Sequence, residues 1–361
     1  MRPRLTVDCA AIADNYRALV RRAQPARVAG IVKANAYGLG ATSVAPVLYE
    51  AGCRDFFVAD LTEANEIAPV IGSDVRLFLL SGLAGEDPRV LNGFVPVLNT
   101  LGEVLLWTKH HNARAARPCA LHIDTGLSRL GLPPAEWVAL RADVALMDRL
   151  NCSLLMSHLA CADQPGHPMN DAQHRTWREV IDSWPTSVTR PRTSLAASAG
   201  IYLGHAYHYD LVRPGGALYG LIDPVMAPDI KLAVTLEAPI IQIRSVDAGG
   251  AVGYGATHSF TRPGRIAILQ IGYADGLFRA LGNAGNVIVH GRKAPIVGRV
   301  SMDVMAIDVT AIDAAAVGDY AEIFGPTQTP DALAVTIGTI GYELTTGLGP
   351  RVERRYVTGA S

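Results

Sequence analysis

The chain has 361 residues, enough for about two domains, and 49% of them are hydrophobic, so it can bury a sizeable core. The net charge is -1 with acids and bases mixed along the chain, which argues against nucleic acid or an anionic membrane surface as the main partner. No apolar run approaches the roughly 18 to 20 residues of a membrane helix, and we find no secretory signal. We therefore expect a cytoplasmic protein. Its five cysteines include no Cys-x-x-Cys pair, and we expect them to be reduced.

The first element in the chain is a predicted helix. Asp8 is a suitable N-cap residue, and Ile12, Tyr16 and Leu19 then fall on one helical face. The residues after Asn99 repeat with the same spacing and predict another helix. Its apolar face would hold Leu101, Val104, Leu105 and Thr108.

From residue 28 to about 220, short apolar runs alternate with helix-like segments. The runs are continuously apolar and often β-branched, which is typical of strands in a buried parallel sheet. The expected strands are Val28–Lys33, Phe56–Ala59, Arg76–Leu80, Phe94–Leu98, Cys119–Asp124, Ser153–Ser157, Thr193–Ala197 and one near Leu211–Arg213. About eight repeats of strand then helix predict a (β/α)8 TIM-like barrel, and the same order also fits a doubly wound open sheet.

After about residue 231 the pattern changes to strand-like runs separated by Gly, Pro and Asp, with little helical periodicity. The runs are Ile240–Val246, Arg265–Ile271, Asn286–His290, Val304–Val309 and Tyr320–Phe324. We predict two domains, the barrel over residues 1–235 and a mainly β domain over residues 236–361. The first residues of the chain can pair with the second domain.

Polar residues that are hard to explain as packing lie at the ends of the predicted strands. Lys33 closes the first strand, and Arg129, His158, Ser198 and Arg213 follow the fifth to the eighth. Each alone has an ordinary explanation, such as a surface lysine, a satisfied core histidine or an ion-paired arginine. In a barrel, however, the C-terminal ends of all strands meet on one face, where active sites form. The sequence therefore predicts one site that contains all five residues.

The loops after the seventh and eighth strands suit a phosphate group, since such loops commonly bind phosphate in these barrels. Ser198 can donate a hydrogen bond, and Gly215 and Gly216 leave their backbone N–H groups open to an anion. No Gly-x-Gly-x-x-Gly or P-loop motif follows a strand, which weakens a nucleotide interpretation. No histidine and carboxylate cluster has the spacing of metal ligands, so we expect no metal.

Six motifs follow one another along nearly the whole chain. Three lie in the predicted barrel, at residues 32–40 (VKANAYGLG), 124–131 (DTGLSRLG) and 213–220 (RPGGALYG). Three lie in the predicted β domain, at residues 252–255 (VGYG), 271–276 (IGYADG) and 298–303 (GRVSMD). With these motifs the chain resembles the bacterial alanine racemases, fold-type III enzymes that depend on pyridoxal phosphate.

The resemblance implies an isomerase that interconverts L-alanine and D-alanine, for the supply of D-alanine to peptidoglycan or for its catabolism. It implies pyridoxal 5'-phosphate bound to Lys33 as a Schiff base, with Lys33 and Tyr254 as the two catalytic bases. Tyr254 would act on the partner subunit of a homodimer with shared active sites. The residues that match cofactor contacts are Tyr37, His158, Ser198, Arg213, Gly215 and Gly216. Those that match substrate contacts are Arg129, Met302 and Tyr273. Tyr273 and Arg279 would also narrow the access channel.

The chemistry of racemisation explains these residue types. A proton leaves one face of the α-carbon and another arrives on the opposite face, so two bases are needed on opposite sides. Arg213 would face the pyridine nitrogen and, because a guanidinium keeps its proton, could donate to that nitrogen without protonating it.

Three places depart from the family pattern. Many members carry a carbamate-modified lysine where this chain has His122, so Arg129 must be oriented by another group, with His122 itself, a bound anion or water as alternatives. Ala197 stands where an asparagine is frequent, before Ser198. Near the C-terminus, residues 350–352 (PRV) stand where some members place a phosphate-binding tyrosine, and we assign none there.

Other functions are open on the sequence. A racemase of broader range, accepting serine for example, would use the same residues. A fold-related decarboxylase would need a pocket for a larger substrate and no base at Tyr254. A non-catalytic pyridoxal-phosphate-binding regulator would need only the barrel, so the predicted β domain argues against it.

Overall fold

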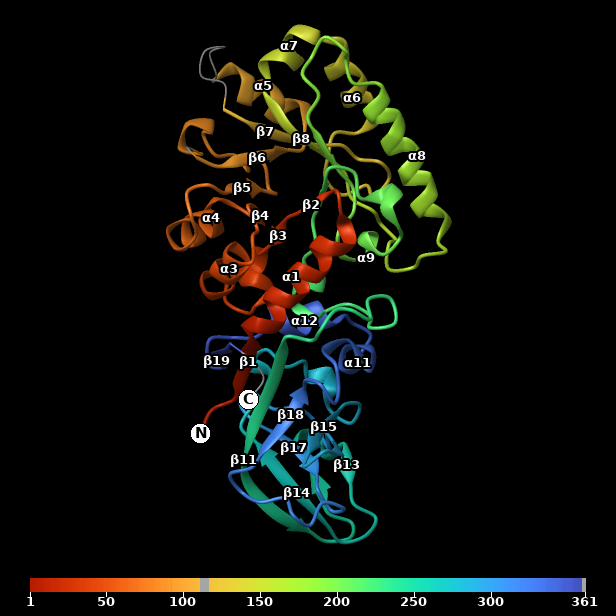
Figure 1. The fold of residues 1–361 in the computed structure, drawn as a ribbon. Coiled ribbons are helices and arrows are strands. Elements are labelled where there is room, and N and C mark those ends of the chain that lie inside the picture. Colours follow the sequence, from red (N-terminus) through yellow and green to blue (C-terminus); the bar gives the residue numbers. More distant parts are fainter. Residues whose placement is uncertain (92, 111–116, 359–361) are drawn as a thin grey trace.

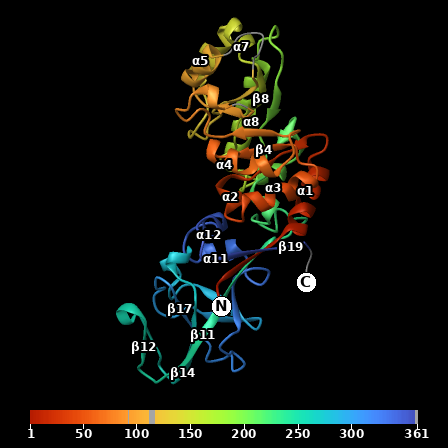
Figure 2. The ribbon, with the colours of Figure 1, turned by 90° about the vertical axis from the view of Figure 1, so that its left-hand side faces the viewer.

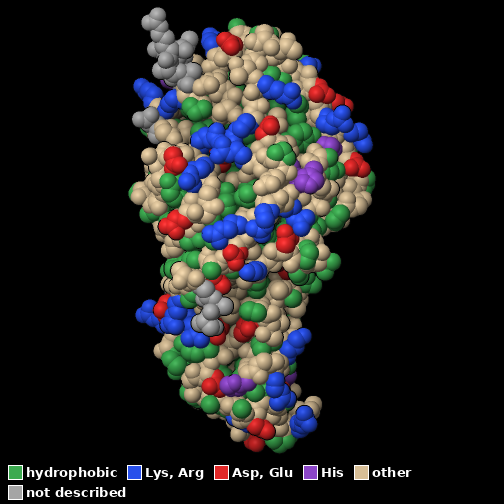
Figure 3. Space-filling model, viewed as in Figure 1, with side chains coloured by type: hydrophobic (Ala, Val, Ile, Leu, Met, Phe, Trp, Pro, Cys, Tyr) green, Lys and Arg blue, Asp and Glu red, His purple; other side chains and the backbone are tan. Residues whose placement is uncertain are grey.

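The computed structural model describes residues 1–91, 93–110 and 117–358, which form an elongated molecule with a barrel at one end and a β-rich half at the other (Figures 1 and 2). Acidic and basic side chains are intermixed over both halves on the face shown in Figure 3. Among the described residues, no helix combines the length and the apolar character needed to cross a membrane.

Eight strand positions form the barrel. They are β2 and β3 together (Arg27–Val28 and Gly30–Ile31), β4 (Asp55–Val58), β5 (Arg76–Leu79), β6 (Val95–Leu98), β7 (Cys119–His122), β8 (Cys152–Met156), β9 (Arg192–Ser194) and β10 (Leu211–Val212). Neighbours from β3 to β9 pair in parallel, and β10 pairs in parallel with β2. Backbone hydrogen bonds from Asp210 to Thr193 and from Arg213 to Ala196 join β10 to the β9 segment, so the ring closes. The predicted TIM-like barrel is confirmed, and the doubly wound alternative is wrong.

The first strand is shorter than expected, because β3 ends at Ile31 and Lys33 lies two residues beyond it. The inside of the barrel is filled by apolar side chains that include Phe57 and Phe78, whose rings stack with centroids 4.4 Å apart. A second and larger apolar cluster lies between the strands and the surrounding helices and continues into the β-rich half. The barrel interior is therefore a packed core, and any site must lie at one of its ends.

Helices cover the outside of the barrel (Figure 1). Asp8 caps the first of them, since its carboxylate accepts a 3.0 Å hydrogen bond from the backbone N–H of Ala11. In the predicted helix after Asn99, Val104 and Thr108 are buried as expected, but Leu105 is exposed and the buried face contains Trp107 instead. The longer helices are α1 (Cys9–Ala23), α3 (Ala41–Glu50), α4 (Leu61–Ile67), α5 (Leu101–Lys109), α6 (Pro134–Ala142), α7 (Val144–Arg149) and α8 (Pro168–Asp182); α2 (Lys33–Tyr37), α9 (Ser198–Ile201) and α10 (Gly216–Tyr219) are short turns at the barrel's end.

The β-rich half is built on one long strand, β11 (Val234–Val246). Its first part pairs with β1 (Arg4–Asp8) and β18 (Tyr320–Phe324), and its second part pairs with β14 (Gly264–Leu269). The first strand of the chain thus belongs to this sheet. The remaining strands are β12 (Ala251–Val252), β13 (His258–Ser259), β15 (Asn286–Val289), β16 (Arg292–Pro295), β17 (Met305–Asp308) and β19 (Glu353–Val357). Two helices follow, α11 (Pro330–Val335) and α12 (Gly341–Thr346); α12 packs beside α2 of the barrel, and α11 packs on α12.

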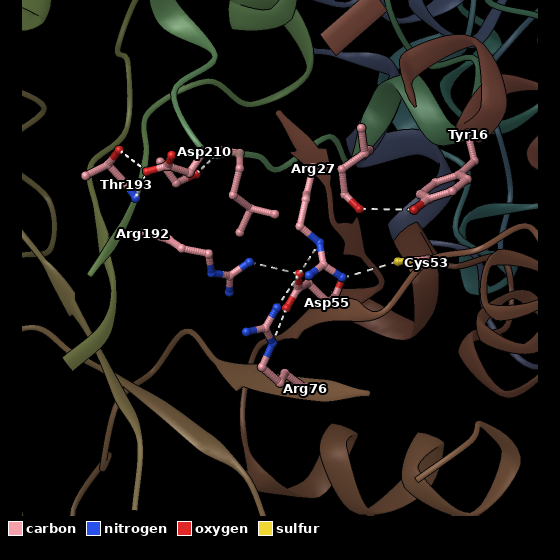
Figure 4. A network of polar contacts seen from close by, with 11 residues as sticks. Tyr16, Arg27, Cys53, Asp55, Arg76, Arg192, Thr193 and Asp210 are labelled. Atoms are coloured by element: carbon pink, nitrogen blue, oxygen red, sulfur yellow. Dashed lines mark hydrogen bonds and ion pairs between the residues drawn. The ribbon is translucent and has the colours of Figure 1, made fainter. Parts of the chain in front are cut away.

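A buried carboxylate ties together the N-terminal ends of four barrel strands (Figure 4). Asp55 is 1% exposed and begins β4, and it receives two hydrogen bonds of 2.6 and 2.9 Å from Arg76, the first residue of β5. Arg192, which begins β9, donates at 3.2 Å, and Arg27, which begins β2, lies 3.8 Å away. One carboxylate therefore links strands from both halves of the ring.

We expect Asp55→Asn to lower the free energy of unfolding by about 3 kcal/mol, because it leaves three guanidinium groups without their common counter-charge. Denaturant titration of the wild type and the variant would measure this. The control is Asp74→Asn, which removes an exposed carboxylate paired with Arg54 and should shift the midpoint little. Equal midpoints for the wild type and Asp55→Asn would contradict the structural role of the cluster.

Candidate functional site

A cavity of about 550 Å³ opens at the C-terminal ends of the barrel strands. Nearly all the barrel residues that the sequence singled out line it, together with a tyrosine from α12 that it did not. The predicted lining residues are Lys33, Tyr37, His122, Arg129, His158, Ser198, Arg213, Gly215 and Gly216, and the added one is Tyr342. The strand ends thus converge on one site, as the barrel geometry requires.

Lys33 enters the cavity from an unusual turn. Ala34, Asn35, Ala36 and Tyr37 all have positive φ angles, between 52° and 58°, in a short left-handed turn that Gly38 closes. Each such residue costs roughly 1 to 2 kcal/mol, so the surrounding contacts must hold the turn in place. Burial, and then the charge of Arg129, lowers the pKa of Lys33 below its ordinary value. The amine is thus easier to deprotonate than a surface lysine.

The guanidinium of Arg213 is buried at the centre of the site, with an exposed fraction of 3%. It donates to the hydroxyl of Ser194, to the carbonyl of Ser157 at 2.5 Å and to the carbonyl of Leu195 at 3.5 Å. Among the described residues, no carboxylate pairs with it. Burial lowers its pKa to about 9, which still leaves it a cation at neutral pH.

Several hydrogen-bond donors converge beside the loop that begins α10. The hydroxyl oxygen of Ser198 accepts from the backbone N–H groups of Gly215 at 3.0 Å and Ala217 at 3.1 Å, so its own proton is left for another acceptor. The phenol rings of Tyr37 and Tyr342 pack edge to face with centroids 5.4 Å apart. Within the described part of the chain, neither phenol oxygen has a hydrogen-bond partner. The group is therefore arranged to donate to an anion.

The two glycines of this loop are required by close packing. A Cβ atom on Gly215 would lie 2.1 Å from the hydroxyl of Tyr37, and one on Gly216 would lie 2.3 Å from the hydroxyl of Tyr342. Any larger residue would displace the two phenols. Tyr342 lies more than 120 residues beyond this loop in the sequence, so no local pattern predicted that the two would meet.

Both histidines of the cavity are held neutral. Burial first, and then the charges of Arg213 and Arg129, lowers the pKa of His122 to about 4 and that of His158 to about 3. The buried amide of Gln173 fixes the backbone around His158, accepting from Ala160 at 2.8 Å and donating to the carbonyl of His158 at 3.0 Å. At neutral pH these rings offer apolar faces and lone pairs rather than positive charge.

Arg129 lies at the open side of the cavity on an exposed loop. The carboxylate of Asp124 shapes this loop by accepting from the backbone N–H groups of Gly126 at 2.9 Å and Ser128 at 3.1 Å. Arg129 itself has no ion pair among the described residues. Lys33, Arg129 and Arg213 face the cavity while Asp163 is the only carboxylate among its described lining residues, so the site attracts anions.

The structure does not bring all predicted site residues together. Tyr254, Met302 and Tyr273 lie in the β-rich half and are outside the lining of the cavity. Their exposed fractions are 73%, 53% and 42%, high values for large apolar side chains. Backbone hydrogen bonds of 3.0 Å join the loops that carry Tyr273 and Met302, and Arg279 is also exposed in this half. These exposed residues of the β-rich half are separate from the cavity within one chain.

Two family models together span most of the chain. The model described as "Alanine racemase, N-terminal domain" matches residues 7–223, and that described as "Alanine racemase, C-terminal domain" matches residues 233–356. The chain is 45% identical to an alanine racemase of Rhizobium meliloti, an alignment covering 99% of this chain and 97% of the relative. It is 43% identical to a biosynthetic alanine racemase of Agrobacterium fabrum, covering 98% and 93%.

Solved structures give the same result. The crystal structure of alanine racemase from Bartonella henselae with covalently bound pyridoxal phosphate superposes with a TM-score of 0.94 at 37% identity, covering 99% of this chain and 100% of that one. Biosynthetic alanine racemase from Pseudomonas aeruginosa superposes with a TM-score of 0.88 at 35% identity, covering 99% and 100%.

The neutral state of His122 predicts a pH dependence of stability. Its pKa is about 4 in the folded chain against 6.5 for an unperturbed histidine, so below pH 6.5 the unfolded chain binds a proton that the folded chain does not. The contribution of neutral His122 to the free energy of unfolding is therefore complete above pH 6.5 and is lost as the pH falls towards 4. Near pH 5, His122→Asn should flatten the slope of unfolding free energy against pH by up to about 1.4 kcal/mol per pH unit. Denaturant titrations at pH 5, 6 and 7 would measure it, and parallel slopes for the two proteins would contradict the assignment.

Proposed function

The chain belongs to the alanine racemase family, and we propose that it is a pyridoxal-phosphate-dependent isomerase that interconverts L-alanine and D-alanine with two bases, Lys33 and Tyr254 of the partner subunit. The single observation that carries this proposal is the cavity at the barrel's end, where a partly buried lysine, two neutral histidines and a buried guanidinium meet a cluster of anion donors. The biosynthetic relatives favour the supply of D-alanine to peptidoglycan over its catabolism.

The cavity residues fit the cofactor. The hydroxyls of Ser198, Tyr37 and Tyr342 and the backbone N–H of Gly216 suit a phosphate group, since none of them donates to an acceptor within the described chain. The N–H of Gly215, which we expected to be open to an anion, donates instead to the hydroxyl of Ser198. Lys33 would hold the cofactor, and His158, with an uncharged ring, would pack against it. Pyridoxal phosphate, when bound, supplies an electron sink for negative charge at the substrate α-carbon.

Arg213 would donate a hydrogen bond to the nitrogen of the cofactor ring. Because its guanidinium is a cation fixed by neutral oxygens, it can donate there but keeps its proton at neutral pH. This arrangement favours return of a proton to the α-carbon over side reactions that move the proton elsewhere. Arg129, exposed at the mouth of the cavity, would bind the substrate carboxylate, with Met302 and Tyr273 of the partner subunit completing the pocket.

The two bases act on opposite faces of the substrate. Lys33, whose pKa is lowered by burial, takes or returns the proton on one face. Tyr254 would serve the other face, but it is 73% exposed and lies in the other half of the molecule. Exposed apolar side chains in a group mark contact surfaces; Tyr273 and Met302 lie on hydrogen-bonded loops, and Tyr254 is exposed in the same half of the molecule. In a cytoplasmic homodimer, the barrel of one copy (within residues 1–235, with β1 belonging to the β-rich sheet) would face the β domain of the other copy (residues 236–361). This arrangement explains why Tyr254 is exposed in one chain and how it reaches a cavity.

We expect the purified protein with pyridoxal phosphate to form D-alanine from L-alanine and L-alanine from D-alanine, because the two bases serve both directions. Chiral chromatography of the products from single amino acids would measure this. L-serine is the second substrate to include, since a broader-range racemase would convert it at a comparable rate. An enzyme that released carbon dioxide or gave no D-alanine would overturn the proposed activity.

Shared sites predict a specific pattern of activity in mixed dimers. A heterodimer of Lys33→Ala with Tyr254→Phe subunits has one site with both bases intact, so it should keep about half of the wild-type activity. The matched control pairs a wild-type subunit with the Lys33→Ala, Tyr254→Phe double variant, which leaves no complete site. Co-expression with two affinity tags and racemisation assays would compare them. If each site used residues of one chain only, the activities of the two heterodimers would be reversed.

A further inference from the structure

A buried pair of side chains, Asn99 and His122, lies under the cavity at the ends of β6 and β7. The oxygen of the Asn99 side chain lies 2.9 Å from Nδ1 of His122, and both residues are buried. The side-chain nitrogen of Asn99 donates to the carbonyls of Val97 at 2.8 Å and Leu80 at 3.2 Å. The proposed two-base reaction gives neither residue a role.

The hydrogen bonds of Asn99 determine which nitrogen of His122 carries the proton. Two backbone carbonyls can only accept, so they fix the NH2 group of Asn99 towards themselves and its oxygen towards His122. That oxygen also only accepts, so Nδ1 of His122 must be the N–H donor. The ring is neutral at working pH, which leaves Nε2 with a free lone pair. Within the described chain, Nε2 has no hydrogen-bond partner.

The edge of the ring that carries Nε2 faces the Arg129 loop. His122 and Arg129 line the same cavity. The loop folds back over β7 through hydrogen bonds from Leu132 to the carbonyl of His122 at 2.8 Å and from Asp124 to the carbonyl of Leu132 at 3.0 Å. Cδ2 of His122, the atom bonded to Nε2, is 3.2 Å from the position of a Cβ on Gly131, two residues after Arg129. A free acceptor therefore lies beneath a loop whose guanidinium lacks a partner in the described structure.

We propose that His122 is a positioning residue for Arg129, whose guanidinium donates to Nε2 of His122 and is thereby aimed at the substrate carboxylate. This inference rests on the proposed function, which gives Arg129 the carboxylate of alanine. An imidazole suits the task because it orients the guanidinium without neutralising it. The charge of Arg129 then remains available to the substrate carboxylate.

Two substitutions of His122 separate its two nitrogens. In His122→Asn the side-chain amide can replace Nδ1 as the donor to Asn99, but no atom reaches the position of Nε2. In His122→Gln the longer amide places an oxygen near the position of Nε2. We therefore expect His122→Asn to weaken carboxylate binding and His122→Gln to restore most of it. Cofactor absorbance and thermal midpoints of the holoenzymes would show that both variants keep the fold and the cofactor.

The probe is propionate, which has the carbon skeleton and carboxylate of alanine but no amine. Loss of a hydrogen bond to a charged group predicts about a tenfold weaker affinity of the His122→Asn holoenzyme for propionate, measured by calorimetry. The KM for L-alanine should rise by about the same factor with little change in kcat, because binding rather than proton transfer is affected. His122→Gln should recover most of both. An unchanged propionate affinity in His122→Asn would overturn the inference.

A double-mutant cycle tests whether His122 acts through Arg129. In the Arg129→Ala background, His122→Asn should weaken propionate binding no further, because the guanidinium it orients is absent. A tenfold loss that persists there would assign His122 a role independent of Arg129 and overturn the inference. If Arg129→Ala alone bound propionate as well as the wild type, the proposed carboxylate role of Arg129 would fail first, so the two failures are distinguishable.

A measurement on the wild-type holoenzyme tests the protonation of the two ring nitrogens directly, and His122→Gln serves only to assign the signals. With 15N-labelled histidine, the resonance pair that His122→Gln lacks should show a protonated Nδ1 and an unprotonated Nε2. The Nε2 resonance should move when propionate saturates the site, as the hydrogen bond from Arg129 forms or tightens. A protonated Nε2, or an Nε2 signal insensitive to propionate, would overturn the inference.

Discussion

A buried guanidinium held by neutral oxygens determines the properties of the active face. Arg213 is 3% exposed, and a charge removed from water must be fully hydrogen-bonded to be tolerated. Ser157 at the end of β8 and the residues 194–195 at the end of β9 supply the oxygens, while Arg213 follows β10 directly. One side chain therefore fixes the relative positions of three strand ends. Its charge also helps to keep the pKa values of His122 and His158 low, so the site has neutral rings beside fixed cations.

Much of this arrangement could be predicted from the sequence, because in a barrel the residue that follows each strand always lies on the same face. Parallel strands end on the same face, so polar residues that follow short apolar runs must meet there. Lys33, Arg129, His158, Ser198 and Arg213 are found together for that reason. The strand boundaries were less certain: β3 ends at Ile31, because the left-handed turn that follows uses Ala34 to Tyr37, residue types that ordinarily avoid positive φ angles.

Contacts between distant segments were beyond prediction from local patterns. Tyr342 reaches the cavity because α12, near the C-terminus, packs beside α2, a contact that neither segment signals on its own. The pairing of Asn99 with His122 likewise depends on two strands lying side by side in a defined register. Tyr254, Tyr273 and Met302 were identified through family motifs, and their exposure within one chain is understandable if their neighbours belong to another copy.

The Asp55 cluster at the opposite end of the barrel can form only late in the synthesis of the chain. Asp55 and Arg192 are 137 residues apart, so the carboxylate leaves the ribosome long before the last of its arginines exists. Until then, the last strand of the growing sheet has no neighbour on one side, and β2 lacks its partner β10. The growing chain must therefore expose unpaired strand edges for most of the time that the barrel takes to be translated. The finished ring, once β10 pairs with β2 and with the β9 segment, has no such edge.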